Sequence, residues 1–291
     1  MASQRLARLF PQGDGPPGRF WVDRGSRLPG RGDFPVKLQH LFDSHAHYED
    51  ALFGEDRHRI LAGLPDQGVE WVLNCCSDLG VAPLVVALTE QYDFVYGSVG
   101  VHPHWVLETP EDYLDQLERL ARSPKVVALG EMGFDYFFDE PRDLQERIFR
   151  GQMDLAQQLK LPVIIHDREA HEDTYRVLEE YKLPGIVHRF SGNVEGLRRV
   201  LDWGMYVSFN GDITWPEYNE TALKVLAATP MERLLIETDA PYMPPKVLEG
   251  QLCDSAMLPH IVEVIAQVKG LDPQEVCDIS AKNAREIYGI N

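Results

Sequence analysis

Two histidines separated by a single residue, His45 and His47, follow the apolar run that begins at Leu41. In a β-strand, residues i and i+2 point to the same side about 6.6 Å apart, so both imidazoles would project from one side of one strand. Such a pair can bind one metal ion when carboxylates converge on it from elsewhere in the chain. The alternative is a strand end that carries two solvated histidines.

Further histidines and carboxylates follow other apolar runs along the chain. They occur in five segments: GVHPHW with His102 and His104, GEMGFD with Glu131 and Asp135, IIHDRE with His166, Arg168 and Glu169, VHRFSG with His188 and Arg189, and IETDAPY with Glu237 and Asp239. Six of the ten histidines therefore lie at the ends of predicted strands. Any one of them could be a structural residue, but their shared placement predicts one pocket lined by imidazoles and carboxylates.

The elements that would position these residues alternate regularly after residue 40. Short apolar segments rich in valine and isoleucine predict strands at 41–44, 70–74, 94–99, 126–129, 163–165, 185–187, 205–208 and 233–236. Amphipathic segments between them predict helices that include 111–122, 144–159, 172–181 and 222–228. This alternation favours βαβ units and a parallel sheet. Eight units over about 250 residues match a closed (β/α)8 TIM barrel, whose carboxyl strand ends form the active-site face; a doubly wound open sheet is the alternative.

Six motifs along the chain resemble, in the same order, the signatures of the TatD-like metal-dependent hydrolases, which belong to the amidohydrolase-like barrels. They are DSHAH, GVHPH, GEMGFDY, PVIIHDREA, HRFSG and LLIETDAPY, and together they extend the resemblance over about residues 41–289. The resemblance implies a two-metal centre and hydrolytic chemistry. In this family the activity is frequently that of a magnesium-dependent deoxyribonuclease, so a DNA strand end is the predicted substrate.

The resemblance also implies roles for individual residues. It assigns six ligands to two divalent ions: His45, His47 and Asp239 for one ion, His166 and His188 for the other, and Glu131 between them. Mixed imidazole and carboxylate ligands suit Mn or Zn, whereas Mg prefers oxygen, so the metal is left open among these three. Two ions about 3.5–4 Å apart can activate water and polarise a phosphodiester. The predicted catalytic residues are Asp239, as general base, and the bridging Glu131.

Three residues are predicted to contact the substrate. Arg168 and Arg189 stand one or two residues beyond metal-binding histidines, and a guanidinium matches the geometry of a phosphate. Either arginine could instead pair with an acid. His102 resembles a family residue that faces the substrate, with a loop hydrogen bond as the alternative. The other polar residues of these motifs are interpreted as structural, solvated or ligand-orienting: His104, His171, Asp135 and Glu237.

The sequence departs from the family pattern at two places. Arg189 stands where the family commonly has cysteine in His-Cys-Phe-Ser-Gly, and the stretch after Tyr242 has Lys246, Asp254 and Ser255 in place of the usual Arg-Gly and Asn. Both differences lie near the predicted pocket and concern the substrate more than the metals. A two-metal hydrolase of a small ester, amide or phosphodiester is therefore the alternative function, and a non-catalytic metal-binding barrel is a further one.

The overall charge restricts the choice of partner. The chain has 28 basic and 46 acidic residues, a net charge of −18. So acidic a protein is repelled by a long phosphate backbone, which argues against a general binder of duplex DNA but not against one that acts on a short strand end.

Residues 1–40 differ from the rest of the chain. They contain six glycines and five prolines and are predicted to form an irregular N-terminal extension, with the hydrolase barrel over 41–291. The four cysteines form no Cys-x-x-Cys motif. No segment reads as a secretory signal or a membrane span, so we predict a cytoplasmic protein without a membrane partner.

Overall fold

The computed structural model describes residues 37–216 and 219–291. Within them, eight parallel strands form one sheet in chain order. The strands are β1 (Leu41–Ala46), β2 (Val69–Asn74), β3 (Val95–Val99), β4 (Val126–Asp135), β5 (Val163–Arg168), β6 (Gly185–Val187), β7 (Tyr206–Phe209) and β8 (Leu234–Ile236). A parallel bridge between Ala46 and Ala240 joins the two edges. The sheet is therefore a nearly closed TIM barrel, and the open-sheet alternative is wrong.

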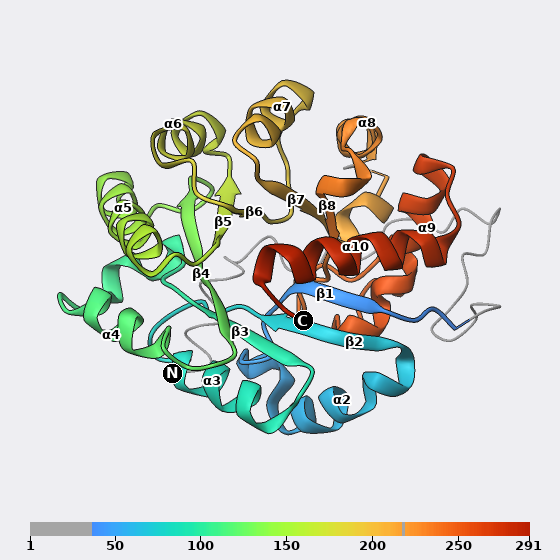
Figure 1. The fold of residues 1–291 in the computed structure, drawn as a ribbon, viewed down its shortest axis with the longest axis horizontal. Coiled ribbons are helices and arrows are strands. Elements are labelled where there is room, and N and C mark those ends of the chain that lie inside the picture. Colours follow the sequence, from blue (N-terminus) through green and yellow to red (C-terminus); the bar gives the residue numbers. More distant parts are fainter. Residues whose placement is uncertain (1–36, 217–218) are drawn as a thin grey trace.

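Helices surround this barrel (Figure 1). They are α2 (Arg57–Gly63), α3 (Ala82–Gln91), α4 (Tyr113–Leu120), α5 (Arg142–Leu159), α6 (His171–Tyr181), α7 (Val194–Asp202), α8 (Asn219–Ala228), α9 (Leu258–Lys269) and α10 (Pro273–Tyr288). Side chains cap two of them, since Asn193 accepts from the Gly196 N–H before α7 and Asp272 from the Gln274 N–H before α10. All eight predicted strands and the four named helices are present, with shifted ends.

The interior of the barrel is filled by side chains. Seven strands contribute one buried residue each to a cluster that also contains α10: Phe42, Leu73, Ala128, Ile164, Ile186, Tyr206 and Leu235. Neighbours along the same strands, such as Leu41 and Val72, belong instead to the layer under the helices. Side chains alternate along a strand, so the first set occupies the inside of the barrel.

Helix α10 covers the end of the barrel where the strands begin. Asn283 donates to the carbonyl of Leu234, the first residue of β8. The Tyr288 hydroxyl donates to the carbonyl of Ser44 in β1, and Figure 1 shows the helix lying across β1 and β8. With the amino end covered, the carboxyl ends of the strands remain as the face that can bind a substrate.

Strand β4 is longer than the predicted 126–129. It pairs with β5 from Met132 through Asp135, opposite Ile165 through Arg168. Glu131 and His166 therefore lie inside strands and not after them, and the predicted ends of these two strands are wrong. Gly133 makes this close pairing possible: its φ is 149°, and a Cβ there would lie 2.0 Å from the carbonyl oxygen of His166.

The structure bears on the predicted extension, on membrane spans and on the cysteines. Residues 1–36 of the predicted extension lie outside the described residues, so the division at residue 40 stays a prediction. Across 37–216 and 219–291, no helix is long and apolar enough to cross a membrane. All four cysteines are buried and none forms a disulfide.

Candidate metal centre

The first group of predicted ligands converges above β1 and β8. His45 Nε2 and His47 Nε2 lie 3.1 Å apart, at 3.2 and 3.3 Å from Glu131 Oε2. Asp239 Oδ1 lies 3.9 Å from the first nitrogen and 3.7 Å from the second. The end of β1, strand β4 and the loop after β8 thus bring four ligand atoms around one point.

The hydrogen bonds behind these two rings decide which nitrogen carries a proton. His47 Nδ1 lies 3.0 Å from the carbonyl oxygen of Cys75 and 3.1 Å from Glu49 Oε1. The carbonyl oxygen can only accept a hydrogen bond, and so can the carboxylate of Glu49 when it is ionised. A proton on Nδ1 satisfies both acceptors and leaves Nε2 as the nitrogen that can bind a metal. His45 Nδ1 lies 3.2 Å from Cys75 Sγ, a thiol that can donate or accept. Two Nε2 atoms gathered at one oxygen of a carboxylate form a donor set that fits a divalent metal.

The second group lies on the other side of Glu131. His166 Nδ1 and His188 Nε2 are each 2.7 Å from Glu131 Oε1 and 3.2 Å from one another. His166 Nε2 donates to Asp135 Oδ2 at 3.0 Å, while His188 Nδ1 lies 3.4 Å from Glu237 Oε1. Acidic side chains thus face the outer nitrogens of both rings, and the two oxygens of Glu131 are divided between the two histidine pairs.

Burial and the surrounding charges set the protonation states of this cluster. Burial raises the pKa of Glu131, but His188, His102 and His45 outweigh it and hold that pKa well below its usual range. Burial, followed by repulsion from His188, lowers the pKa of His45. Burial also lowers the pKa of His102 well below its usual value, with a contribution from His166. Burial also lowers the pKa values of His47, His166 and His188, but neighbouring carboxylates outweigh it and raise all three, that of His188 to about 10. Metal binding to these rings would therefore displace protons from them.

His102 lies inside the cluster, with its Nε2 3.5 Å from Glu131 Oε1. Its Nδ1 accepts the backbone N–H of His104 at 3.1 Å. Neutral His102 therefore carries its proton on Nε2 and directs a donor into the site. The loop hydrogen bond that was the alternative does form, and it leaves the other nitrogen available to a substrate oxygen.

Comparisons with known proteins show the family to which the chain belongs. The sequence profile of the family described as "TatD related DNase" matches residues 42–289. The chain belongs to this family. A relative in Bacillus subtilis, "Uncharacterized metal-dependent hydrolase YabD", is 33% identical over 255 residues, which cover 86% of this chain and 100% of the relative. The predicted family and enzyme class, a metal-dependent hydrolase, are thereby confirmed.

Two Escherichia coli proteins extend the comparison. "3'-5' ssDNA/RNA exonuclease TatD" is 33% identical over 263 residues, covering 86% of this chain and 99% of that protein. The crystal structure of the TatD homologue YjjV superposes with a TM-score of 0.82 and 28% identity, over 87% of this chain and 99% of that one. The barrel from β1 to α10 is thus the full length of these TatD-family relatives.

The two arginines of this TatD-family chain are placed differently. The Arg168 guanidinium lies 3.7 Å over the ring of Phe137. Arg189 Nε is 2.6 Å from Asp212 Oδ2, so the predicted alternative of pairing with an acid occurs. Lys246, in the altered loop after β8, lies 3.0 Å from Glu249 and 4.1 Å over the Trp215 ring. Substrate contacts by Arg168 and Arg189 stay predictions.

The other motif residues have the orienting and structural contacts that were expected of them. Asp135 Oδ2 accepts from His104 at 2.9 Å as well as from His166. Glu237 accepts from Ser208 and from the backbone N–H of Arg189. His171 lies 2.7 Å from Asp167, which raises the pKa of this partly exposed imidazole.

Two residues that orient the first histidine pair were not predicted. Glu49 contacts His47, and Cys75 contacts both histidines through its thiol and its carbonyl. Glu49 stands two residues after His47 in the sequence, which is a usable signal. Cys75 directly follows β2, 28 residues away from His47, so only the fold brings it there.

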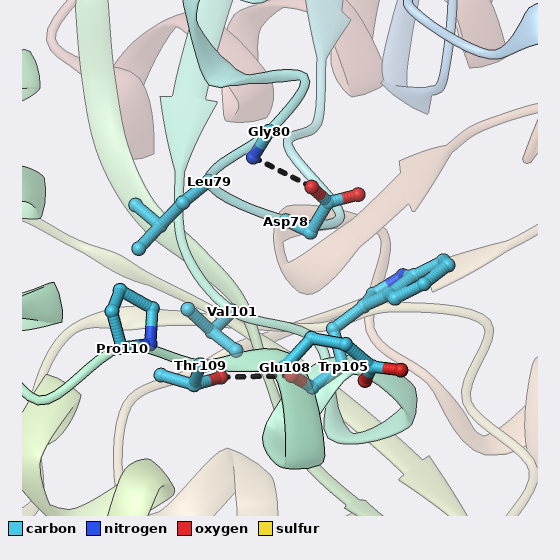
Figure 2. Close-up of a pocket in the computed structure, with 8 residues that line it drawn as sticks. All are labelled: Asp78, Leu79, Gly80, Val101, Trp105, Glu108, Thr109 and Pro110. Carbon is cyan, nitrogen blue, oxygen red and sulfur yellow. Dashed lines mark hydrogen bonds between the residues drawn. The ribbon is translucent and has the colours of Figure 1, made fainter. Parts of the chain in front are cut away.

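A small pocket of about 120 Å3 lies beside the metal centre and does not include it. Figure 2 shows its lining, which includes Asp78, Val101 and Trp105. The pocket contains none of the six predicted ligands. The chemistry of this chain is therefore located by its converging ligand atoms and not by the shape of this pocket.

Proposed function

We propose that this chain is a two-metal phosphodiesterase that removes nucleotides from the ends of single-stranded DNA. The observation that carries the proposal is the division of Glu131: one oxygen faces His45 and His47, and the other faces His166 and His188. A carboxylate shared by two imidazole pairs is suited to two ions. The name of the E. coli relative, a 3'-5' ssDNA/RNA exonuclease, supports the substrate class.

Two bound divalent ions would supply positive charge to phosphate oxygens and lower the pKa of an attacking water. Asp239 is suited to accept the proton of that water. Its side chain is 12% exposed, against 2% for Glu131, so it reaches the mouth of the site while it remains beside the ligands. Glu131 remains ionised and holds the two groups of ligands together. His102 donates from Nε2 to a phosphate oxygen, where negative charge develops in the transition state.

A small ester, amide or phosphodiester is the second candidate substrate. It is favoured by the pairing of Arg189 with Asp212, which neutralises one of the two predicted phosphate contacts, and by the net charge of −18. Either substrate uses the same metal centre, so only rates on defined substrates separate the two.

The test uses the purified full chain with Mg2+, Mn2+ or Zn2+. Single-stranded DNA labelled at its 5′ or 3′ end, duplex DNA, single-stranded RNA and a panel of small esters and phosphodiesters are compared. We expect stepwise shortening of single-stranded DNA, its abolition by His45→Ala, and no effect of Leu252→Ala, an exposed residue of the loop after β8 that is no predicted ligand. Turnover of a small substrate without DNA cleavage would select the second candidate. Two bound ions without any turnover would select a non-catalytic barrel.

A further inference from the structure

The loop after β4 exposes an aromatic surface beside the metal centre. Phe137 is 39% exposed and is one of three large hydrophobic side chains that are exposed in the described part of the chain. The ring of Phe138 lies 5.0 Å from it, edge to face at 80°. The exposed ring of Phe137, packed against a second ring, therefore offers an aromatic face to a ligand beside the proposed metal ligands.

A cation lies over this surface. The Arg168 guanidinium is 3.7 Å above the centre of the Phe137 ring and 5.5 Å from that of Phe138. Backbone pairing holds the arginine there, because the Tyr136 N–H donates to the carbonyl of Arg168 at 2.9 Å. A planar guanidinium against an aromatic face provides an extended flat surface with one positive charge.

Short contacts join this aromatic surface to the proposed ligands. The Phe137 N–H donates to Asp135 Oδ1 at 3.0 Å, and Asp135 Oδ2 accepts from His166. The Phe138 ring lies 4.1 Å from that of His104. Arg168 is two residues beyond His166 on β5. One carboxylate therefore positions both a proposed metal ligand and the aromatic loop.

The overall charge explains why such a surface is needed. Proteins that bind nucleic acid through phosphates rely on clustered lysines and arginines, whereas this chain has a net charge of −18. Base stacking on aromatic rings strengthens binding without a basic surface and tolerates any base, because every base has a flat face. Paired bases inside a duplex do not offer this face.

We propose that Phe137, Phe138 and Arg168 form a base-stacking subsite that binds one unpaired nucleobase next to the scissile phosphate. The inference rests on the proposed function and adds to it that the enzyme recognises single-stranded nucleic acid through a base, without preference for its identity. Duplex ends become substrates only when they fray.

The test compares two oligonucleotides bound by the full chain. Both carry a fluorescent label, and one has abasic sites in the terminal nucleotides where the other has bases. Ca2+ replaces the catalytic ion, and dissociation constants are measured by anisotropy. We expect Phe137→Ala to weaken binding of the base-bearing strand about 5- to 20-fold, within the range for loss of one stacking partner. The abasic strand should bind the wild type and the variant alike, and Phe137→Trp should restore binding of the normal strand.

Leu252→Ala is the matched control, since Leu252 has the same 39% exposure and lies in the loop after β8. It should change neither constant. Stacking releases no counterions, so Phe137→Ala should leave the slope of log K against log[salt] unchanged. Equal weakening of both strands would show that Phe137 only supports the loop and would overturn the subsite.

Failure of the subsite and failure of the proposed function give different results. If the wild type cleaves single-stranded DNA while Phe137→Ala binds the base-bearing strand as well as the wild type does, only the subsite is wrong. If the wild type neither binds nor cleaves any single-stranded nucleic acid with Mg2+, Mn2+ or Zn2+, the proposed function is wrong and the subsite with it. Melting temperatures of the variants show whether each is folded.

Discussion

Asp135 is the residue whose replacement tests the arrangement of the metal centre most directly. Its Oδ2 accepts from His166 Nε2 at 3.0 Å and from His104 Nε2 at 2.9 Å, and its Oδ1 accepts the Phe137 N–H at 3.0 Å. An asparagine has one acceptor oxygen on the side-chain amide. In Asp135→Asn, either the two imidazoles or the backbone N–H would therefore face an NH2 group.

The magnitude follows from the position of Asp135 behind His166. Loss of a carboxylate that orients a metal-binding histidine typically weakens metal affinity about 10- to 100-fold, which corresponds to about 1.4 to 2.7 kcal/mol. The effect should be confined to the ion held by His166 and His188. The other proposed ion would be bound by His45 and His47, whose rings contact Cys75 and Glu49.

The assay is calorimetric titration of the metal-free chain with Mn2+, with two binding steps resolved for the wild type. Asp167→Asn is the matched control: this buried carboxylate, next to His166 on β5, contacts His171 at 2.7 Å, outside the metal centre. We expect Asp135→Asn to lower the Mn2+ affinity of one of the two binding steps, and Asp167→Asn to change neither. Unchanged affinity for both ions, or equal weakening of both, would refute the assigned division of ligands.

Three other predictions concern stability. Metal binds the folded chain through a site that is absent after unfolding, so Mn2+ at 100 times its dissociation constant should stabilise the protein by about 2.7 kcal/mol and chelation should lower the melting temperature; equal melting curves would contradict a folded-state site. Leu73→Ala should cost about 2–5 kcal/mol in urea unfolding, because the side chain is fully buried inside the barrel, whereas a cost below 1 kcal/mol would contradict that packing. Hydrogen bonds from Arg176 and Arg150 lower the pKa of Glu146 from 4.5 to about 2. The ion pairs of Glu146 contribute about 1 kcal/mol to the free energy of unfolding, as expected of a partly exposed network. This contribution is complete above pH 4.5 and is lost as the pH falls toward 2. The stability difference between wild type and Glu146→Gln should therefore shrink as the pH falls from 4.5 to about 2. A constant difference in urea titrations would count against the ion pairs.

The sequence by itself was sufficient for the fold class and for the set of candidate ligands. Alternating apolar and amphipathic segments are local patterns, since a strand or helix records its buried face in its own residues. Eight such units imply a barrel, and a barrel places all carboxyl strand ends at one face. His45 and Asp239 could therefore be assigned to one site although they are far apart in the chain.

Only the tertiary structure decided contacts that depend on pairing between distant segments. The length of β4 follows from its register with β5, which places Glu131 within a strand. Arg189 faces Asp212 across 23 residues, and Cys75 reaches two histidines from another strand. The exposure of Phe137 also had no local signal, because the preceding Phe134 in the same short segment is buried. Residue type and spacing record which face of an element is buried, whereas the partner of each polar group depends on distances that exist only after the strands have paired.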